Sequence, residues 1–302
     1  MDQARQVAGR SVVNYDLFKF RAVVDWIQIE FATAAPTNFG AVKRNCGLDY
    51  VKALNPGLGS AATIFRTRIQ DPPRWHAVAA KLAAIDARFP FATPPAVTAI
   101  EVSFDAYGKG ASPDELAEQA CRFFKFQTRP VDKNRRFSGR WKGDVEGLRH
   151  YDRVRRMVRG GRVIAIGNKT DDRSQRVYFK TTDKAGKVAL PENQWRARIE
   201  LTLQGQCLPA TSDLEWATCK FEQLYEFFNF REPKPNLDPM IQLLLDRSEQ
   251  VGERKPRSRV ATSKPGSGNN HLFDLATKAD LVLNDKARTA IRELSRRWAR
   301  VQ

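Results

Sequence analysis

The sequence predicts an α+β fold in which one face of an antiparallel sheet is polar and open and helices pack on the other. Three segments alternate apolar and polar residues with the two-residue period of a β-strand, namely residues 98–105, 175–181 and 196–204. Other segments space their apolar residues three and four apart, as amphipathic helices do. Hydrophobic residues make up 42% of the chain and include 18 Phe and 6 Trp, which is enough to build a core.

The first expected element is a strand over residues 23–31. Its residues alternate, so that Asp25 and Ile27 should lie on one face and Val24 and Trp26 on the other. The next strand, residues 98–105, places Ile100, Val102 and Phe104 on the core side and Glu101, Ser103 and Asp105 on the polar side.

Helices are expected between and after the strands. One begins near Pro73, and a second follows Ser112, because Ser-Pro-Asp-Glu over residues 112–115 has the form of a capping box with proline at the first helical position. A short strand over residues 162–167 precedes the two strands in the middle of the chain. Two further helical segments are expected over residues 213–228 and 237–250.

Composition divides the chain into three parts. Residues 1–250 hold every predicted strand and form the main domain, which carries the site. Residues 251–270 contain almost no large apolar side chain and are rich in Gly, Pro, Ser and basic residues, which is typical of a flexible basic linker. Residues 271–302 regain a helical pattern and are expected to form a C-terminal helical tail.

Charge gives the strongest compositional signal. The net charge of +17 indicates a polyanionic partner, either nucleic acid or an anionic membrane surface. A membrane is the weaker alternative, because no apolar run reaches 18 residues and residues 1–10 lack the apolar stretch of a signal peptide. We therefore expect a cytoplasmic protein that binds nucleic acid and no membrane.

Basic residues concentrate in one segment. Residues 129–162 hold twelve Lys and Arg against four Asp and Glu, a balance of +8. This segment is either a polyanion-binding surface or a solubilising one, and we favour the first. The candidate phosphate-binding cations are Arg153, Arg155, Arg156, Lys169 and Arg198.

Cysteine and histidine predict no metal site. The four cysteines form no Cys-x-x-Cys pair, and the three histidines form no closely spaced pair. We expect reduced thiols and no histidine-cluster metal centre.

The polar faces of the strands bring together groups that cleave phosphodiesters. Arg176, Tyr178 and Lys180 share one strand face, and a tyrosine hydroxyl with a reference pKa of about 10 needs nearby positive charge to act as a nucleophile. Arg176 and Lys180 are placed to supply this charge. The alternative is an ordinary solvated strand face with cross-strand ion pairs.

Carboxylates on the neighbouring strands predict a divalent cation. Carboxylates repel a phosphate unless a cation lies between them, which argues for Mg²⁺ or Mn²⁺. Glu101 and Glu200 are the preferred ligands. Asp105 is a weaker candidate, since four residues along a strand span about 13 Å and one ion cannot bind both Glu101 and Asp105 without a bulge.

These residues resemble a known family. Residues 167–180, Gly-Asn-Lys-Thr-Asp-Asp-Arg-Ser-Gln-Arg-Val-Tyr-Phe-Lys, and residues 195–201, Trp-Arg-Ala-Arg-Ile-Glu-Leu, resemble the core of the trans-acting plasmid and filamentous-phage rolling-circle replication initiation factors, a family that includes conjugative relaxases. Residues 100–105 resemble its acidic strand and residues 24–29 its opening strand. The resemblance covers roughly residues 20–230.

The resemblance implies a function. Tyr178 would be the nicking residue of a replication initiator or relaxase, whose active site on the open face of the sheet cleaves origin DNA by transesterification. Cleavage would leave a 5′-phosphotyrosine link and a 3′-OH primer. The implied partners are double- and single-stranded origin DNA and a bacterial host's helicase and polymerase. The alternative function is non-catalytic binding of single-stranded nucleic acid on the same sheet.

Overall fold

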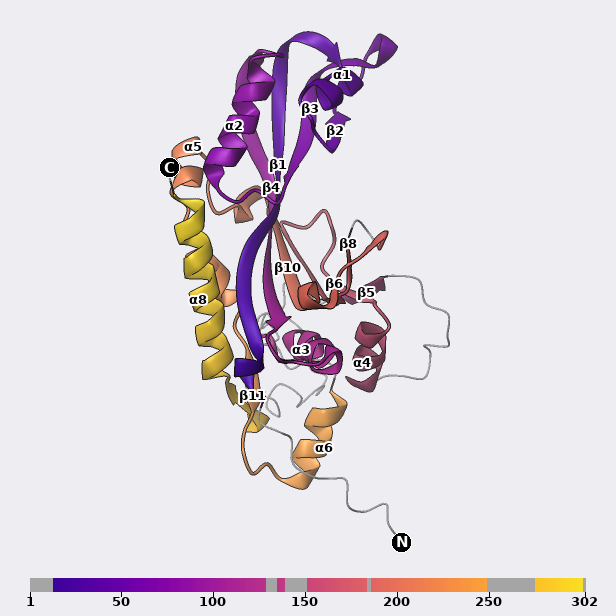
Figure 1. The fold of residues 1–302 in the computed structure, drawn as a ribbon, viewed down its shortest axis with the longest axis vertical. Helices are drawn as coiled ribbons and strands as arrows, with labels where there is room; N and C mark the ends of the chain where they lie inside the picture. Colours follow the sequence, from indigo (N-terminus) through magenta and orange to yellow (C-terminus); the bar gives the residue numbers. More distant parts are fainter. Residues whose placement is uncertain (1–12, 129–134, 139–150, 184–185, 249–274, 301–302) are drawn as a thin grey trace, which may run out of the picture.

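The computed structural model describes residues 13–128, 135–138, 151–183, 186–248 and 275–300, and it confirms the α+β class. Its centre is an eight-stranded antiparallel sheet (Figure 1) with strand order β2-β3-β1-β4-β10-β7-β6-β5. The strands of this sheet are β1 (Phe18–Asn38), β2 (Tyr50–Ala53), β3 (Ala61–Gln70), β4 (Phe91–Gly108), β5 (Arg135–Ser138), β6 (Val163–Ile166), β7 (Arg173–Lys180) and β10 (Arg196–Gln204).

Two short antiparallel strand pairs lie outside the sheet. They are β8 (Thr182–Asp183) with β9 (Val188–Ala189), and β11 (Arg231–Pro233) with β12 (Thr277–Ala279). The helices are α1 (Phe39–Asn45), α2 (Trp75–Asp86), α3 (Pro113–Phe126), α4 (Tyr151–Arg159), α5 (Asp213–Ala217), α6 (Pro239–Arg247) and α8 (Leu281–Trp298). No helix in the described part of the chain is both long enough and apolar enough to cross a bilayer.

The two longest strands, β1 and β4, run through most of the molecule (Figure 1). At one end β1 also pairs with β3, and α1, α2 and β2 complete that end. Towards the other end β4 pairs with β10, and α3 packs against β10, β7 and β4. Helix α8 runs along β1 (Figure 1). The helices therefore cover the apolar face and leave the polar side chains of the central strands on the other.

A β-bulge in β1 overturns the single alternation expected for residues 23–31. Val24 pairs with Val102 and Trp26 with Glu101, so Asp25 has no partner residue on β4. An extra residue in one strand shifts all following side chains to the opposite face. As a result Val24 and Ile27 both point into the core, whereas Asp25 and Trp26 are only partly buried on the polar side.

Sequence periodicity also fails over residues 213–228, which do not form one helix. Helix α5 ends at Ala217, where the Thr218 hydroxyl donates to the Leu214 carbonyl. Phe221 then takes a left-handed backbone with φ of 36°, a conformation that non-glycine residues rarely adopt and that the sequence does not signal. Within α5, Leu214 is exposed and Trp216 is buried.

The helix expected at the C-terminus belongs to the main core. Leu283, Ile291, Leu294 and Trp298 of α8 are buried in the same cluster as the sheet. The indole of Trp298 donates to the Trp216 carbonyl at 2.8 Å, and its ring lies 6.3 Å from that of Trp75. The predicted linker, residues 251–270, lies outside the described residues, and the division into domains stays a prediction.

Trp298 should therefore be one of the most important residues for folding. We expect Trp298→Ala to lower the free energy of unfolding by about 3–5 kcal/mol, because a fully buried aromatic side chain is lost together with its hydrogen bond. Urea denaturation followed by circular dichroism measures this loss. Arg292→Ala, on the exposed face of the same helix, is the control and should change stability by less than about 0.5 kcal/mol. A loss below 1 kcal/mol for Trp298→Ala would mean that α8 is dispensable for the core.

Candidate active site

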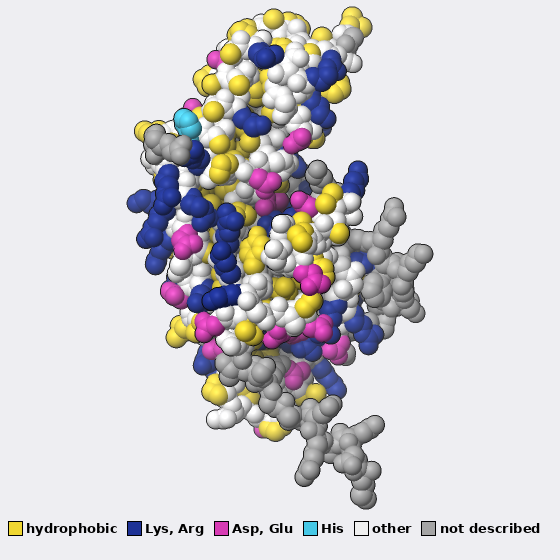
Figure 2. All heavy atoms as spheres, in the orientation of Figure 1, with side chains coloured by type: hydrophobic (Ala, Val, Ile, Leu, Met, Phe, Trp, Pro, Cys, Tyr) yellow, Lys and Arg dark blue, Asp and Glu magenta, His cyan; other side chains and the backbone are white. Residues whose placement is uncertain are grey.

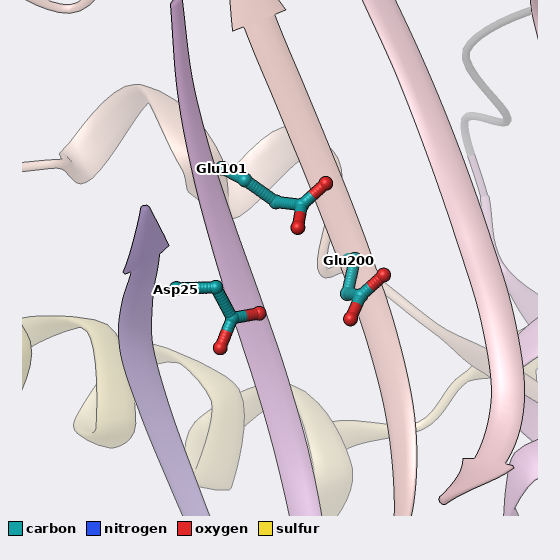
Figure 3. Close-up of side chains that lie close together, drawn as sticks. All are labelled: Asp25, Glu101 and Glu200. Carbon is teal, nitrogen blue, oxygen red and sulfur yellow. The ribbon is translucent and has the colours of Figure 1, made fainter. Parts of the chain in front are cut away.

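Three carboxylates from three adjacent strands converge on one point (Figure 3). Asp25 of β1, Glu101 of β4 and Glu200 of β10 each present an oxygen, and these oxygens lie within 4.8 Å of one another. Glu101 and Glu200 are each 3% exposed. Figure 3 shows the three side chains in front of the strands, with helices behind. The two glutamates that the sequence predicts as metal ligands are thus brought together on the polar face.

Asp25 is a functional candidate that sequence periodicity missed. Simple alternation placed it on the same face as the apolar Ile27, whereas the bulge turns it towards Glu101 and Glu200. An acidic residue on the otherwise apolar side of a predicted strand was the available signal. Such a residue is costly to bury, so it points either to a bulge or to a charged partner.

Asp105, the weaker metal candidate, is held apart from this cluster by arginine. Its two oxygens accept hydrogen bonds from Arg198 Nε and Nη2, both at 2.6 Å, and Arg196 Nε lies 3.4 Å away. This bidentate pairing uses the carboxylate edge that a cation would need. Glu101 and Asp105 lie apart along β4, as the sequence predicts, and they have different contacts: Glu101 belongs to the carboxylate cluster, whereas Asp105 binds Arg198.

Arg198, expected to bind DNA phosphates, is buried instead. It is 3% exposed, and besides Asp105 it donates to both Asp25 oxygens at 3.0 Å. A guanidinium enclosed in this way has no free edge for a phosphate. Its position suits it to fix the carboxylates and to offset part of their charge.

Arg176 is the second cation of the site and is much more accessible. Its Nη2 lies 2.9 Å from both Glu101 oxygens and 2.7 Å from Glu200 Oε2. The Arg176 side chain is 48% exposed, whereas the two carboxylates are 4% exposed. Arg176 thus closes the cluster on its solvent side, beside Tyr178 as the sequence predicts.

Tyr178 points into the cluster. Its hydroxyl donates to Glu200 Oε1 at 2.5 Å. Burial raises the pKa of Tyr178 well above its ordinary value, and the Glu200 charge raises it further. Burial, together with the charge of Glu101, also raises the pKa of Glu200, which makes Glu200 a stronger base. The hydroxyl and a proton acceptor are therefore already in contact, but the tyrosine is not ionised by this environment.

Lys180, the other cation predicted to assist Tyr178, faces elsewhere. Its ammonium lies 3.1 Å from Asp183, three residues further along the chain. Its catalytic role stays a prediction that this ion pair does not support.

Two neutral groups orient Glu101. The Trp26 indole donates to Oε1 at 2.7 Å and the Thr202 hydroxyl to Oε2 at 2.8 Å. Arg68 stacks on the outer side of the Trp26 ring at 4.2 Å. These contacts fix the direction of the carboxylate, which a catalytic or metal-binding group requires.

The residues present fit a hard divalent cation. Three carboxylate oxygens within reach of one point form the donor set that Mg²⁺ and Mn²⁺ prefer. Ser103, fully buried between Glu101 and Asp105 on β4, has a hydroxyl with no hydrogen bond of ordinary length and angle. The hydroxyl interacts with the Asp25 carboxylate and lowers the pKa of Asp25, so it belongs to the same polar cluster.

The predicted DNA-binding cations of α4 lie away from the carboxylates. Helix α4 packs against α3, on the helical side of the sheet. Arg155 forms a two-pronged ion pair with Glu118 at 2.9 Å, while Arg156 is exposed. Lys169 is exposed in the loop between β6 and β7. A role for these residues and Arg153 in binding DNA stays a prediction.

Comparison with known proteins adds little to this geometry. No family model matches the chain, and no curated protein does. Among solved structures, the chain is similar to a rolling circle replication initiator protein from Geobacillus stearothermophilus at 14% identity, over 73% of this chain and 90% of that one, with a TM-score of 0.34. So distant a likeness carries no functional conclusion, and the chemistry must be argued from the residues.

The pH dependence of folding stability tests the raised pKa of Asp25. Burial raises its pKa to about 6, partly opposed by Arg198 and reinforced by Glu200 and Asp105. Between about pH 4 and pH 6 the unfolded chain loses this proton and the folded protein keeps it, so raising the pH through this window lowers stability. In metal-free protein, Asp25→Asn should therefore be more stable than the parent at pH 8, by up to about 3 kcal/mol, and the difference should vanish towards pH 4.

Urea denaturation at several pH values after EDTA treatment measures this difference. Asp49→Asn, an exposed carboxylate remote from the site, is the control and should leave the profile unchanged. A loss of stability at pH 8 in Asp25→Asn would show that the attraction between Asp25 and Arg198 outweighs the cost of burying the charge.

Proposed function

We propose that this chain is a DNA-nicking enzyme with a tyrosine nucleophile, acting as a rolling-circle replication initiator or relaxase. The observation that carries the proposal is the hydrogen bond from Tyr178 to Glu200, inside a cluster of three carboxylates that Arg176 closes on its solvent side. A net charge of +17 supports a nucleic-acid substrate. The sequence resemblance of residues 167–180 and 195–201 supports the specific role at a replication origin.

The reaction is an in-line displacement at phosphorus. The Tyr178 oxygen forms a bond to the scissile phosphorus as the bond to the 3′-oxygen breaks. Glu200, which already accepts the hydrogen bond, takes the tyrosine proton, and the leaving 3′-oxygen takes a proton from solvent. The product is a phosphotyrosine at the 5′ side and a free 3′-OH. Since the tyrosine ester keeps the energy of the broken bond, the strand can be rejoined without ATP.

The negative charge of the site must be offset before a phosphate can approach. Asp25, Glu101 and Glu200 are the residues that would hold Mg²⁺ or Mn²⁺. Such an ion, when bound, polarises the scissile phosphate and favours the ionised tyrosine. Trp26 and Thr202 keep Glu101 pointed at this place, and Arg198 does the same for Asp25.

Arg176 has a second use in this scheme. It is half exposed, and among the described residues its ion pairs are with Glu101 and Glu200, which would also hold the cation, so the two would compete for these carboxylates. Its positive charge already lowers the pKa of Tyr178, and its guanidinium would bind the scissile phosphate beside this residue and neutralise charge in the transition state.

Non-catalytic binding of single-stranded nucleic acid is the second candidate. It requires aromatic rings exposed on the sheet for bases to stack on. Among the described residues, the exposed aromatic side chains are Phe39 and Tyr50, on α1 and β2 at one end of the molecule. The polar face carries fixed carboxylates instead, which favours the enzyme.

Replacing the nucleophile tests the proposal directly. Tyr178→Phe should abolish nicking of a supercoiled plasmid carrying the cognate origin, together with the covalent protein–DNA adduct seen on a denaturing gel. DNA affinity should stay within about threefold, because only a hydroxyl is lost. Tyr50→Phe, at an exposed tyrosine on β2, is the control and should nick normally. Undiminished adduct formation by Tyr178→Phe would remove Tyr178 from the mechanism.

Replacing Arg176 tests whether this arginine and a metal ion compete for Glu101 and Glu200, and the test does not depend on enzymatic activity. Arg176→Gln should bind Mn²⁺ about tenfold more tightly than the parent, because the ion no longer competes with a guanidinium for Glu101 and Glu200. Titration calorimetry on DNA-free protein measures the affinity. Arg66→Gln, which removes a partly exposed arginine paired with Glu30, is the matched control and should leave Mn²⁺ affinity unchanged. Weaker Mn²⁺ binding by Arg176→Gln would show that Arg176 organises the site rather than occupying it.

A further inference from the structure

The outer face of α8 carries a row of arginines. Arg288, Arg292 and Arg296 are exposed at four-residue spacing, and the exposed Arg300 continues the spacing just beyond the helix. Twelve residues of helix rise about 18 Å, so the row is a ridge about that long. Figure 2 shows dark-blue side chains gathered over this side of the molecule.

These cations lack counter-ions among the residues that the structure describes. None of the four arginines forms an ion pair within 4.0 Å of a described carboxylate, in contrast to Arg155 on α4. Unpaired arginines this close together repel one another, which costs stability unless an anion binds. The ridge is therefore a surface that a polyanion would stabilise.

The ridge continues onto β1 and towards the candidate active site. Arg297 of α8 donates to the Ala22 carbonyl at 2.6 Å, three residues before Asp25. Burial lowers the pKa of Arg297, and the charges of Arg21 and Arg300 lower it further, while the charge of Glu293 raises it, so all three charged residues lie near Arg297. Figure 2 shows the dark-blue groups extending from the side of α8 towards the magenta carboxylates at the centre.

Arg21 joins the ridge to the strand that borders the site. Arg21 pairs in register with Asp105 on β4. Burial and the charge of Asp105 raise the pKa of Tyr107, and the charges of Arg196, Arg198 and Arg21 lower it. Arg196 in turn lies 5.2 Å from the Tyr107 ring. A path of positive charge thus runs from α8 to the edge of the carboxylate cluster.

We propose that this surface, the α8 ridge of Arg21, Arg288, Arg292, Arg296, Arg297 and Arg300, binds the sugar-phosphate backbone of duplex DNA beside the cleavage site. Arginine suits phosphate because its fork of donors matches two phosphate oxygens. Phe18 and Phe20 line a pocket beside α8, but Phe18 is buried and Phe20 is partly buried against the core, so among the described residues the ridge has no exposed ring on which unpaired bases could stack. Backbone contacts on a duplex are the mode that remains.

This inference rests on the proposed function only where it places the ridge near a cleavage site. Binding of duplex DNA by the ridge can be measured separately. Phosphate contacts carry no sequence information, so the ridge should bind origin and unrelated duplexes alike. Each lost contact should reduce the slope of log affinity against log salt by about 0.9. All binding measurements use the Tyr178→Phe background, so an absence of nicking does not affect them.

The test removes three exposed arginines that touch neither the core nor the site. The triple variant Arg288→Gln, Arg292→Gln, Arg296→Gln should bind a fluorescent 30-base-pair duplex of unrelated sequence at least tenfold more weakly, with a salt slope smaller by up to about 2.7. Its affinity for a single-stranded oligonucleotide should change by less than threefold. Fluorescence anisotropy over a range of salt concentrations gives both values.

A charge-matched variant distinguishes the effect of the ridge on DNA affinity from the effect of the protein's net charge. Lys43→Gln, Lys52→Gln, Lys81→Gln removes the same three charges from exposed positions on α1, β2 and α2 and should leave duplex affinity within threefold. An equal loss in both triple variants would overturn the proposal, because affinity would then follow net charge alone. An unchanged salt slope in the α8 variant, or an equal loss for single strands, would overturn it as well.

Discussion

The structure depends on keeping three carboxylates together inside a folded protein. Asp25, Glu101 and Glu200 lie close enough to share one ion and are almost closed to solvent, an arrangement that is strongly unfavourable unless cations are supplied. The sheet supplies two arginines from neighbouring strands. Arg198 comes from the strand that carries Glu200, and Arg176 from the next strand. Strand register places Arg176 opposite Glu200 and Arg198 opposite Asp105, and the Arg198 side chain also reaches Asp25 on β1.

The two arginines differ in how firmly they are held. Arg198 is enclosed and bound in bidentate fashion by Asp105, so its charge is permanent. Arg176 is half exposed and is held by ion pairs to Glu101 and Glu200. In the proposed mechanism, the charge of Arg198 would help to keep the carboxylates ionised, and Arg176 would compete with a metal ion for Glu101 and Glu200. Asp105 therefore contributes indirectly, by fixing the cation that keeps Asp25 in position.

Much of this arrangement was predictable from strand periodicity, and its failures have local causes. The contact between Tyr178 and Glu200 follows from two regular strands whose polar residues share a face, and the separation of Asp105 follows from strand rise. Asp25 was missed because one extra residue in β1 reverses the face of every side chain beyond it. The break after Ala217 was missed because Phe221 adopts a backbone conformation that its side chain does not reveal.

The DNA-binding role expected for residues 129–162 stays a prediction, and part of this segment lies outside the described residues. Counting basic residues pointed to residues 129–162, but the count does not show that Arg155 is neutralised by Glu118. Helix α8 has fewer cations, yet its arginines face outwards without carboxylate partners among the described residues, and unpaired charge is what a phosphate backbone meets. Because Trp298 locks α8 into the core and Arg297 bonds to β1 beside Asp25, a duplex held on this helix would be held rigidly relative to the carboxylates. Fixed distance between a binding surface and a reactive group is what positions one phosphodiester, rather than its neighbours, at the nucleophile.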